Sequence, residues 1–269
     1  MLRPPYKRYE TLYLYAFSGC HPDLRALPDP DFIGCWEEDG LSVLFFHREK
    51  DGLPEKISQF YGLKFELSAA VPYEEWGEGR RLTPFRVGPL SLAPVWEEGS
   101  YDLRFDPGVV FGSGGHPTTR LMLDSLWELW EKAGPFTQVL DLGCGSGLLT
   151  LLAAKLGAMV TAVDRNPLCV ALTKKNLEIN GLSAEVLEED VRKVIGRPVD
   201  LVLANLYKGL LLELLGLPSF QTSRYYLISG FVISMEAELR EAIWGAGFEI
   251  EDRKEEEGWV CILLRNPKT

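Results

Sequence analysis

The sequence contains few of the residues that build metal sites and disulfide frameworks. It has three histidines, His21, His47 and His116, and five cysteines with no C-x-x-C pair. A structural zinc site needs several closely spaced ligands of these types, and a secreted disulfide scaffold needs paired cysteines. We therefore expect no metal ion, and free thiols in a reducing cytoplasm.

Long apolar runs and an excess of basic charge are also missing. The most apolar stretch, residues 199–217, is broken by Asn205 and Lys208, so it is shorter than the roughly 18–20 residues of a membrane span. The first residues, MLRPPYKRYE, lack the apolar segment of a signal peptide. The net charge of −11 disfavours sequence-specific nucleic-acid binding and would suit a basic partner. These absences predict a cytoplasmic protein without membrane contact.

What the sequence does contain is enough apolar residues, 46% of 269, for a sizeable core in one or two domains. Aromatic and β-branched residues at 10–17 and 41–47 predict strands, and a short helix at 54–62 is followed by the strand-like LKFELSA. These elements predict a small α+β domain over residues 1–72. Residues 73–100 are rich in Gly, Pro and charge, which indicates a linker leading into a short hairpin.

From residue 101 to residue 269 the pattern becomes an alternation of strands and helices. A helical stripe runs through TTRLMLDSLWELWEKAG, and the strand-like QVLDLG, MVTAVD, AEVLEED, DLVLANL and YYLISGF follow, several of them separated by helical segments. Such alternation is typical of a parallel sheet covered on both faces. The final stretch, FEIEDRKEEEGWVCILLRN, predicts an antiparallel hairpin at the end of the sheet.

Two glycine-rich loops precede helices within this region, FGSGGHPTTR at 111–120 and DLGCGSG at 141–147. In the second loop, Gly143 and Gly145 let the backbone approach a ligand closely, and the following helix offers free N–H groups. Asp164 ends the next predicted strand, where a carboxylate can accept both hydroxyls of a ribose. The arrangement predicts a nucleoside site at the carboxyl edge of the sheet.

The spacing of the glycines favours one class of cofactor. Dinucleotide-binding dehydrogenases have G-x-G-x-x-G, whereas this loop is G-x-G-x-G with Asp141 before it, which suits S-adenosylmethionine because an acid can receive its ammonium group. Asp190 ends the predicted strand AEVLEED and would reach the adenine amino group, or is simply a solvated carboxylate. Asn205 ends DLVLAN and would lie next to the transferred methyl group, or is only a turn former.

These residues resemble the PrmA family, which methylates ribosomal protein L11 of the large subunit. The resemblance rests on VWEEGSYDLRFDPGVVFGSGGHPTTRLML, VLDLGCGSGLLTLLAAKLGA, VDLVLANL and LISGF, and it covers roughly residues 71–266. FGSGGHPTT is similar to the family signature F-G-T-G-x-H-x-T-T. The resemblance implies a Rossmann-like, seven-stranded class I methyltransferase domain behind a small N-terminal α+β domain that recognises the substrate.

The resemblance also implies roles for individual residues. Thr119, Gly143, Asp164 and Asn205 match the positions that bind the cofactor, and Asn205 would accept hydrogens from the acceptor amine and orient it. His116 matches the signature histidine, which either holds the loop together or contacts substrate.

The chain departs from the family pattern on the side where substrate is expected. After Asn205 the family usually has Ile-Leu-Ala, where this chain has Leu206, Tyr207 and Lys208. Tyr207 would line the acceptor slot or be a packed aromatic. Two alternatives to L11 methylation follow: a methyltransferase of the same fold that acts on another protein or a small molecule, and a non-catalytic docking module.

Overall fold

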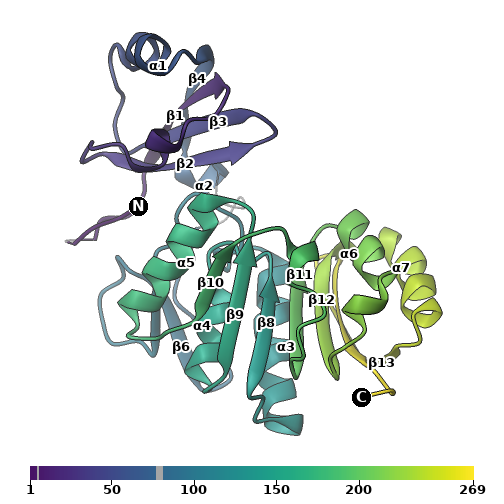
Figure 1. Ribbon diagram of the computed structural model, residues 1–269. Coiled ribbons are helices and arrows are strands. Elements are labelled where there is room, and N and C mark those ends of the chain that lie inside the picture. Colours follow the sequence, from purple (N-terminus) through teal and green to yellow (C-terminus); the bar gives the residue numbers. More distant parts are fainter. Residues whose placement is uncertain (5, 77–80) are drawn as a thin grey trace.

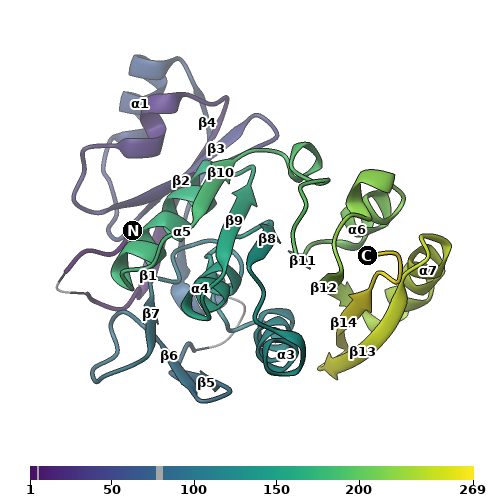
Figure 2. The same cartoon turned by 60° about the horizontal axis from the view of Figure 1, so that its bottom comes forward.

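The computed structural model describes residues 1–4, 6–76 and 81–269, and these residues form three sheets (Figure 1). A four-stranded antiparallel sheet lies above a seven-stranded, mainly parallel sheet, and a three-stranded sheet lies at the side of the larger one (Figures 1 and 2). No helix formed by these residues is both long and apolar enough to cross a membrane. No group of three or more His, Cys, Asp or Glu among them is placed to hold a metal ion.

The first sheet has the strand order β2-β3-β1-β4. Its strands are β1 (Thr11–Ser18), β2 (Phe32–Glu38), β3 (Leu41–Phe46) and β4 (Lys64–Pro72), with the 3₁₀ helix η1 (Pro22–Ala26) and the helix α1 (Leu53–Tyr61) in its connections. Alternation along β1 gives the sheet two apolar faces. Tyr15 and Phe17 pack with Ile57 of α1, whereas Leu12 and Leu14 face the larger sheet and pack with Leu172.

The three-stranded sheet joins the two larger ones. The short helix α2 (Tyr73–Trp76) leads to β5 (Phe85–Val87), β6 (Leu90–Pro94) and β7 (Leu103–Phe105). The predicted hairpin is therefore confirmed as the pair β5–β6, which is antiparallel. Residues 77–80 of the predicted linker lie outside the described residues, and the predicted domain limits at 72 and 100 stay predictions.

The seven-stranded sheet has the order β10-β9-β8-β11-β12-β14-β13. Its strands are β8 (Gln138–Leu142), β9 (Met159–Asp164), β10 (Glu185–Glu188), β11 (Leu201–Asn205), β12 (Tyr225–Val232), β13 (Glu249–Glu256) and β14 (Trp259–Arg265). The first five in sequence are parallel, and β14 pairs antiparallel with both β12 and β13. The parallel sheet, its seven strands and its closing antiparallel hairpin are thus confirmed.

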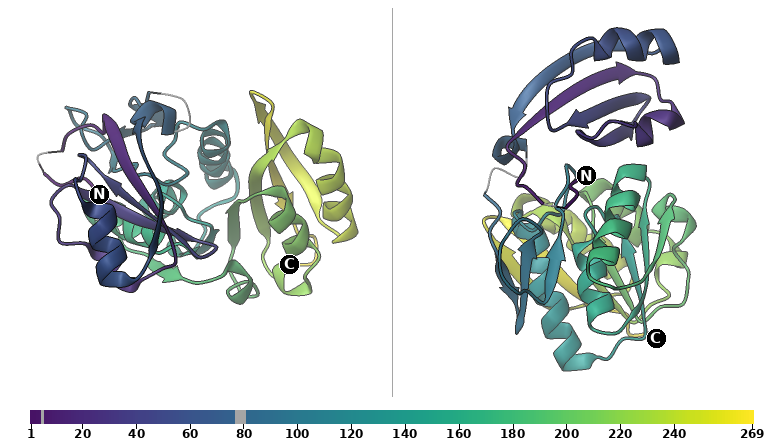
Figure 3. Two further views of the ribbon diagram at one scale, coloured as in Figure 1. Left: turned by 90° about the horizontal axis from the view of Figure 1, so that it is seen from above. Right: turned by 90° about the vertical axis from the view of Figure 1, so that its left-hand side faces the viewer.

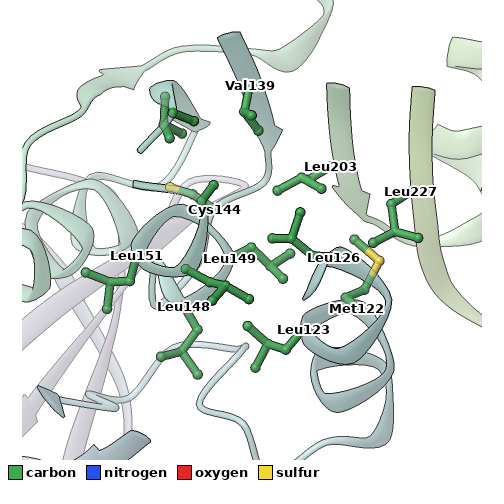
Figure 4. Packing of buried hydrophobic residues seen from close by; sticks show 14 of the residues in the cluster. Met122, Leu123, Leu126, Val139, Cys144, Leu148, Leu149, Leu151, Leu203 and Leu227 are labelled. Carbon is green, nitrogen blue, oxygen red and sulfur yellow. The ribbon is translucent and has the colours of Figure 1, made fainter. Parts of the chain in front are cut away.

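Helices cover both faces of this sheet. They are α3 (Pro117–Ala133), α4 (Leu148–Lys155), α5 (Pro167–Ile179), α6 (Lys208–Leu215) and α7 (Ile233–Gly245), with the 3₁₀ helices η2 (Val191–Lys193) and η3 (Pro218–Phe220). Residues of α3 and α4 pack on one face against Val139, Leu203 and Leu227 (Figure 4), while α6 and α7 pack on the other against Leu140 and Val202. Neighbouring strand residues thus point to opposite cores.

Some elements differ from those the sequence predicts. The sequence does not predict β2, because prolines precede it, or α6, because its leucines show no clear helical period. β10 ends at Glu188, so Asp190 does not end the strand but caps the 3₁₀ helix η2, where it accepts a hydrogen bond from the backbone N–H of Arg192. A short polar side chain in that position satisfies a free N–H, which explains why the strand stops earlier.

Asp106 ties the N-terminal segment to the larger sheet. Its carboxylate is fully buried and accepts hydrogen bonds from Leu2 N (3.0 Å), Tyr9 Oη (2.9 Å) and Gly108 N (2.9 Å). It also forms an ion pair with Lys175 of α5 at 2.5 Å. These partners come from the chain start, from the segment just before the first glycine-rich loop and from α5. One side chain therefore fixes the relative positions of these three segments.

Asp106→Ala should lower the free energy of unfolding by about 3–5 kcal/mol, because it leaves the Lys175 ammonium and several buried donors without their acceptor. Urea unfolding followed by tryptophan fluorescence would measure this. Glu66→Ala, which breaks the solvent-exposed pair with Lys64, is the control and should hardly move the midpoint. Equal effects of both variants would contradict the structural role of Asp106.

Candidate functional site

A cavity of about 280 Å³ lies at the carboxyl edge of the seven-stranded sheet. The residues that line it include many of the predicted site residues: Gly143, Gly145, Asp164, Asp190, Asn205 and Tyr207. They come from the ends of β8, β9, β10 and β11 and from the segment before α6. The structure therefore brings these predicted residues to one place, which is where ligands bind in open parallel sheets.

The two glycine-rich loops are in direct contact beside this cavity. The Phe111 carbonyl oxygen accepts a hydrogen bond from Ser146 N (3.0 Å), and Ser146 Oγ donates to the Gly112 carbonyl oxygen (2.6 Å). Gly145 has φ +54°, and a Cβ atom there would lie 2.6 Å from the Phe111 carbonyl oxygen. Glycine at position 145 is thus required both by its backbone conformation and by the close approach of the other loop.

Asp164 connects the second glycine loop to α5. One carboxylate oxygen accepts a hydrogen bond from Gly145 N (3.0 Å) and the other from Asn166 N (2.9 Å). Burial raises the pKa of Asp164, although the hydrogen bonds from Asn166 and Gly145 oppose the shift. Each oxygen keeps a lone pair, so the carboxylate can still accept hydrogen bonds from a ligand in the cavity.

Asp141 lies deeper, within β8, and does not line the cavity. Its Oδ2 atom accepts a hydrogen bond from Thr150 Oγ1 of α4 at 2.6 Å. Burial raises the pKa of Asp141 to about 6, the Thr150 hydrogen bond opposes this shift and the charge of Asp164 adds to it. Two acids with raised pKa values in one site favour a positively charged ligand, because a cation would stabilise both carboxylates.

Asp190 lines the cavity but is partly covered by a cation. Arg192 Nη1 lies 2.9 Å from Asp190 Oδ2, and the same guanidinium forms an ion pair with Glu213 of α6. Burial alone would raise the pKa of Asp190, but hydrogen bonds from Arg192 outweigh it and the pKa is lowered. Asp190 is therefore an ionised carboxylate. An adenine amino group that binds it, as predicted, would bind beside Arg192, which already pairs with the same carboxylate.

Asn205 is held by a chain of hydrogen bonds that ends at His116. Asn205 Nδ2 donates to Thr118 Oγ1 (3.2 Å), which lies 2.8 Å from His116 Nδ1. Thr118 N also donates to His116 Nδ1 (3.3 Å), so that nitrogen is the unprotonated acceptor and the Thr118 hydroxyl donates to it. Because the Thr118 hydroxyl donates its hydrogen to His116, its oxygen can accept a hydrogen bond from Asn205 Nδ2. This hydrogen bond fixes which side of the Asn205 amide carries the nitrogen.

His116 is the N-cap of α3 and is packed between two aromatic rings. Its ring centroid lies 4.5 Å from that of Trp259 and 5.1 Å from that of Phe111. This packing matches loop stabilisation, the first of the two roles that the sequence left open, and does not by itself exclude a contact with substrate.

Buried polar atoms without a partner gather around the site. Among the described residues, the buried side-chain atoms with no hydrogen-bond partner are Thr119 Oγ1, Asp141 Oδ1, Asn205 Oδ1 and Ser223 Oγ. All but the last belong to predicted cofactor residues. A buried acceptor or donor without a partner costs about 1–3 kcal/mol, so a ligand that supplies the missing partners recovers that free energy.

The segment after Asn205 is shaped by a glycine of β12. Gly230 has φ +101°, and a Cβ atom there would overlap the backbone of Leu206. The Leu206 side chain in turn lies against Gly143, where a Cβ atom would approach it to 2.6 Å. Tyr207 follows with its side chain 62% exposed at the cavity, so it is not the packed aromatic of the second interpretation.

Sequence reasoning missed the part of the site that comes from the first sheet. Trp36 and Glu38 of β2 line the cavity, together with Arg165, which forms an ion pair with Glu38. The backbone carbonyl of Glu37 also accepts a hydrogen bond from Asn166 Nδ2 (3.3 Å). The signal available was the run of aromatic and aliphatic residues at the start of FIGCWEE, which the preceding prolines obscured.

Comparison with protein families gives a match over most of the chain. The family described as "Ribosomal protein L11 methyltransferase (PrmA)" matches residues 47–267, which extends the sequence resemblance toward the N-terminus by more than twenty residues. A ribosomal protein L11 methyltransferase from Geobacter sulfurreducens is 33% identical over 273 residues, covering 93% of this chain and 90% of that protein. One from Caldanaerobacter subterraneus subsp. tengcongensis is 33% identical over 215 residues, covering 76% and 68%.

Solved structures agree with this match. A crystal structure of ribosomal protein L11 methylase from Lactobacillus delbrueckii subsp. bulgaricus superposes with a TM-score of 0.60 at 25% identity. It covers 68% of this chain and 98% of that one. The sheet order and the helices on its two faces therefore belong to the class I methyltransferase fold.

Gly145→Ala should destabilise the protein much more than Gly157→Ala. Both glycines have positive φ, which costs an alanine about 1–2 kcal/mol, but nothing lies within 4 Å of a Cβ atom at Gly157. At Gly145 the overlap with Phe111 adds to that cost and separates the two loops. Thermal unfolding of the two variants would measure the difference, and equal shifts would contradict the proposed contact.

Proposed function

Because the chain belongs to the ribosomal protein L11 methyltransferase (PrmA) family, we propose that it transfers methyl groups from S-adenosylmethionine to amines of ribosomal protein L11. The chain is an S-adenosylmethionine-dependent methyltransferase, as its family is. The observation that carries the finer proposal is the Asn205 side chain. Its amide is oriented by Thr118 while its carbonyl oxygen, buried at the cavity, has no partner among the described residues.

The residues around the cavity suit the cofactor. Asp164 would accept the ribose hydroxyls, and Gly143 and Gly145 leave room for close backbone approach. Thr119 and Asp141 do not line the cavity, but each has a buried oxygen without a partner among the described residues. Asp190 would bind the adenine amino group beside Arg192. When bound, S-adenosylmethionine supplies a methyl group on a positively charged sulfur, and the acids with raised pKa values match that charge.

The protein must present the acceptor as a neutral amine with its lone pair directed at the methyl group. A lysine amine has a pKa of about 10.4 in water and an α-amine about 7.7–8.0, so a lysine has to lose its proton first. Entry into a site that excludes water lowers the pKa of such an amine. The Asn205 carbonyl oxygen would then accept one N–H of the amine and fix its direction. Alignment of this kind is worth about 7–11 kcal/mol of barrier.

Purified protein incubated with labelled S-adenosylmethionine and purified L11 tests the proposal. We expect label on L11, and we expect Asn205→Ala and Asp164→Ala to reduce it by about 10²-fold or more, since each removes a positioning contact. Asp23→Ala changes an exposed acid that does not line the cavity, so it is the control and should label normally. A parallel reaction uses whole-cell lysate as acceptor.

Each outcome assigns the chain differently. Label on another lysate protein but not on L11 would contradict the proposed acceptor and leave the methyltransferase chemistry intact. Full activity of folded Asn205→Ala and Asp164→Ala would contradict the roles of these residues.

Thr118→Val should lower kcat by roughly tenfold or more and leave the Kd for S-adenosylmethionine nearly unchanged, because it keeps the side-chain shape but removes the hydrogen bonds that orient Asn205. Thr118→Ser keeps the hydroxyl and should restore kcat. Steady-state kinetics and calorimetry would measure both quantities. If Thr118→Ser is as slow as Thr118→Val, packing rather than orientation explains the effect.

A further inference from the structure

A second cavity, of about 350 Å³, lies beside the first, between the N-terminal sheet, α2 and residues 108–113. Its walls are mainly aromatic and aliphatic, and include Trp36, Phe45, Tyr73, Trp76 and Phe111. Figure 3 shows the N-terminal sheet stacked over the larger one, and the cavity lies where these two parts meet. None of the predicted site residues lines it, so the cofactor proposal leaves it without a role.

The walls of this cavity are fixed by hydrogen bonds and ring packing. Tyr73 Oη donates to the Gly108 carbonyl oxygen (2.8 Å), and Trp76 Nε1 donates to the Val109 carbonyl oxygen (3.0 Å). The rings of Phe45 and Trp76 pack edge to face with centroids 5.0 Å apart. A pocket whose walls are held in this way is formed before any ligand arrives, so ordering it on binding costs little.

The two cavities are continuous in their lining. Trp36, Glu38 and Phe111 line both of them. Glu38 stands at this junction with its carboxylate paired to Arg165 and to Trp36 Nε1 (3.2 Å). The two cavities therefore meet at a wall that these three residues share.

We propose that the aromatic cavity holds the hydrocarbon stem of the acceptor lysine and directs its amine past Phe111 to the cofactor cavity. The proposal rests on the proposed function and names a subsite for its substrate. The occupant is argued from the continuity of the two cavities and from the lining, which suits four methylene groups rather than a polar segment. Two exposed acids on α2, Glu74 and Glu75, add a negative charge that attracts an incoming ammonium group.

The subsite would supply what the chemistry demands of the acceptor. Packing the methylene groups against Trp36, Phe45 and Trp76 removes apolar surface from water, which favours binding of the stem. The same walls exclude water around the amine as it moves inward, and so favour its neutral form. An aromatic face also tolerates the ammonium group while it is still charged.

Variants of the cavity, assayed on the full-length protein with L11 as acceptor, test this subsite. Val43→Phe fills the aromatic cavity without touching the cofactor cavity, because Val43 lines only the former. We expect the KM for L11 to rise by about tenfold or more while the Kd for S-adenosylmethionine stays unchanged. Trp76→Leu removes a wall of the aromatic cavity alone, so it should raise the KM in the same direction, and it provides a second test if Val43→Phe does not fold.

Trp244→Leu is the matched control, since Trp244 is an exposed tryptophan of α7 away from both cavities. Its KM for L11 should equal that of the wild type. Unchanged KM values in folded Val43→Phe and Trp76→Leu would overturn the subsite and would indicate that the acceptor enters the cofactor cavity directly. Failure of the wild type to label L11 would instead contradict the proposed function, so the two failures are distinguishable.

Discussion

The contact between the two glycine-rich loops is the constraint on which the site depends. Because Gly145 has no side chain, the Phe111 carbonyl oxygen can approach the turn after β8, and Ser146 can hydrogen-bond to both Phe111 and Gly112. That contact fixes where the first loop ends and α3 begins. His116 then caps α3, and Thr118 in the first turn of this helix makes the hydrogen bond that orients Asn205. A change at one glycine therefore reaches the amide at the end of β11, although the two are far apart in sequence.

The site stores free energy that a suitable ligand recovers. Thr119, Asp141 and Asn205 each keep a buried oxygen without a partner among the described residues, at a cost of about 1–3 kcal/mol each. The rest of the structure supports this cost through two apolar cores, one on each face of the parallel sheet. Of these atoms, Asn205 Oδ1 belongs to a residue that lines the cavity, so a ligand with a hydrogen-bond donor would satisfy it there. A positive charge on that ligand would oppose the raised pKa of the deeper Asp141. Selectivity for the proposed cofactor would then depend on buried polar atoms such as Asn205 Oδ1 more than on the size of the cavity.

The sequence predicted most of the parallel sheet because burial on both faces gives short apolar strands that end in glycine or polar residues, as in QVLDLG and DLVLAN. The same rule placed Gly143, Asp164 and Asn205 at one sheet edge. It could not find α6, whose residues are apolar on nearly every side, or β2, which packs on α5 where Gly34 leaves space for Leu168. Nor could it show that Arg192 shares Asp190, since that pairing arises within a 3₁₀ helix that replaces the end of a predicted strand.

The position of β2 changes how the N-terminal sheet should be understood. A recognition module joined only by a linker would contact the acceptor protein and leave the chemistry to the larger sheet. Here Trp36 and Glu38 line the cofactor cavity, Glu38 pairs with Arg165, and Asp106 fastens the chain start to α5. The N-terminal sheet is therefore a wall of the candidate site, and under the proposed function its sequence would be constrained by the cofactor as well as by the acceptor. Divergence confined to its outer face would alter recognition, whereas divergence at Trp36 or Glu38 would also alter the cavity that we propose for the cofactor.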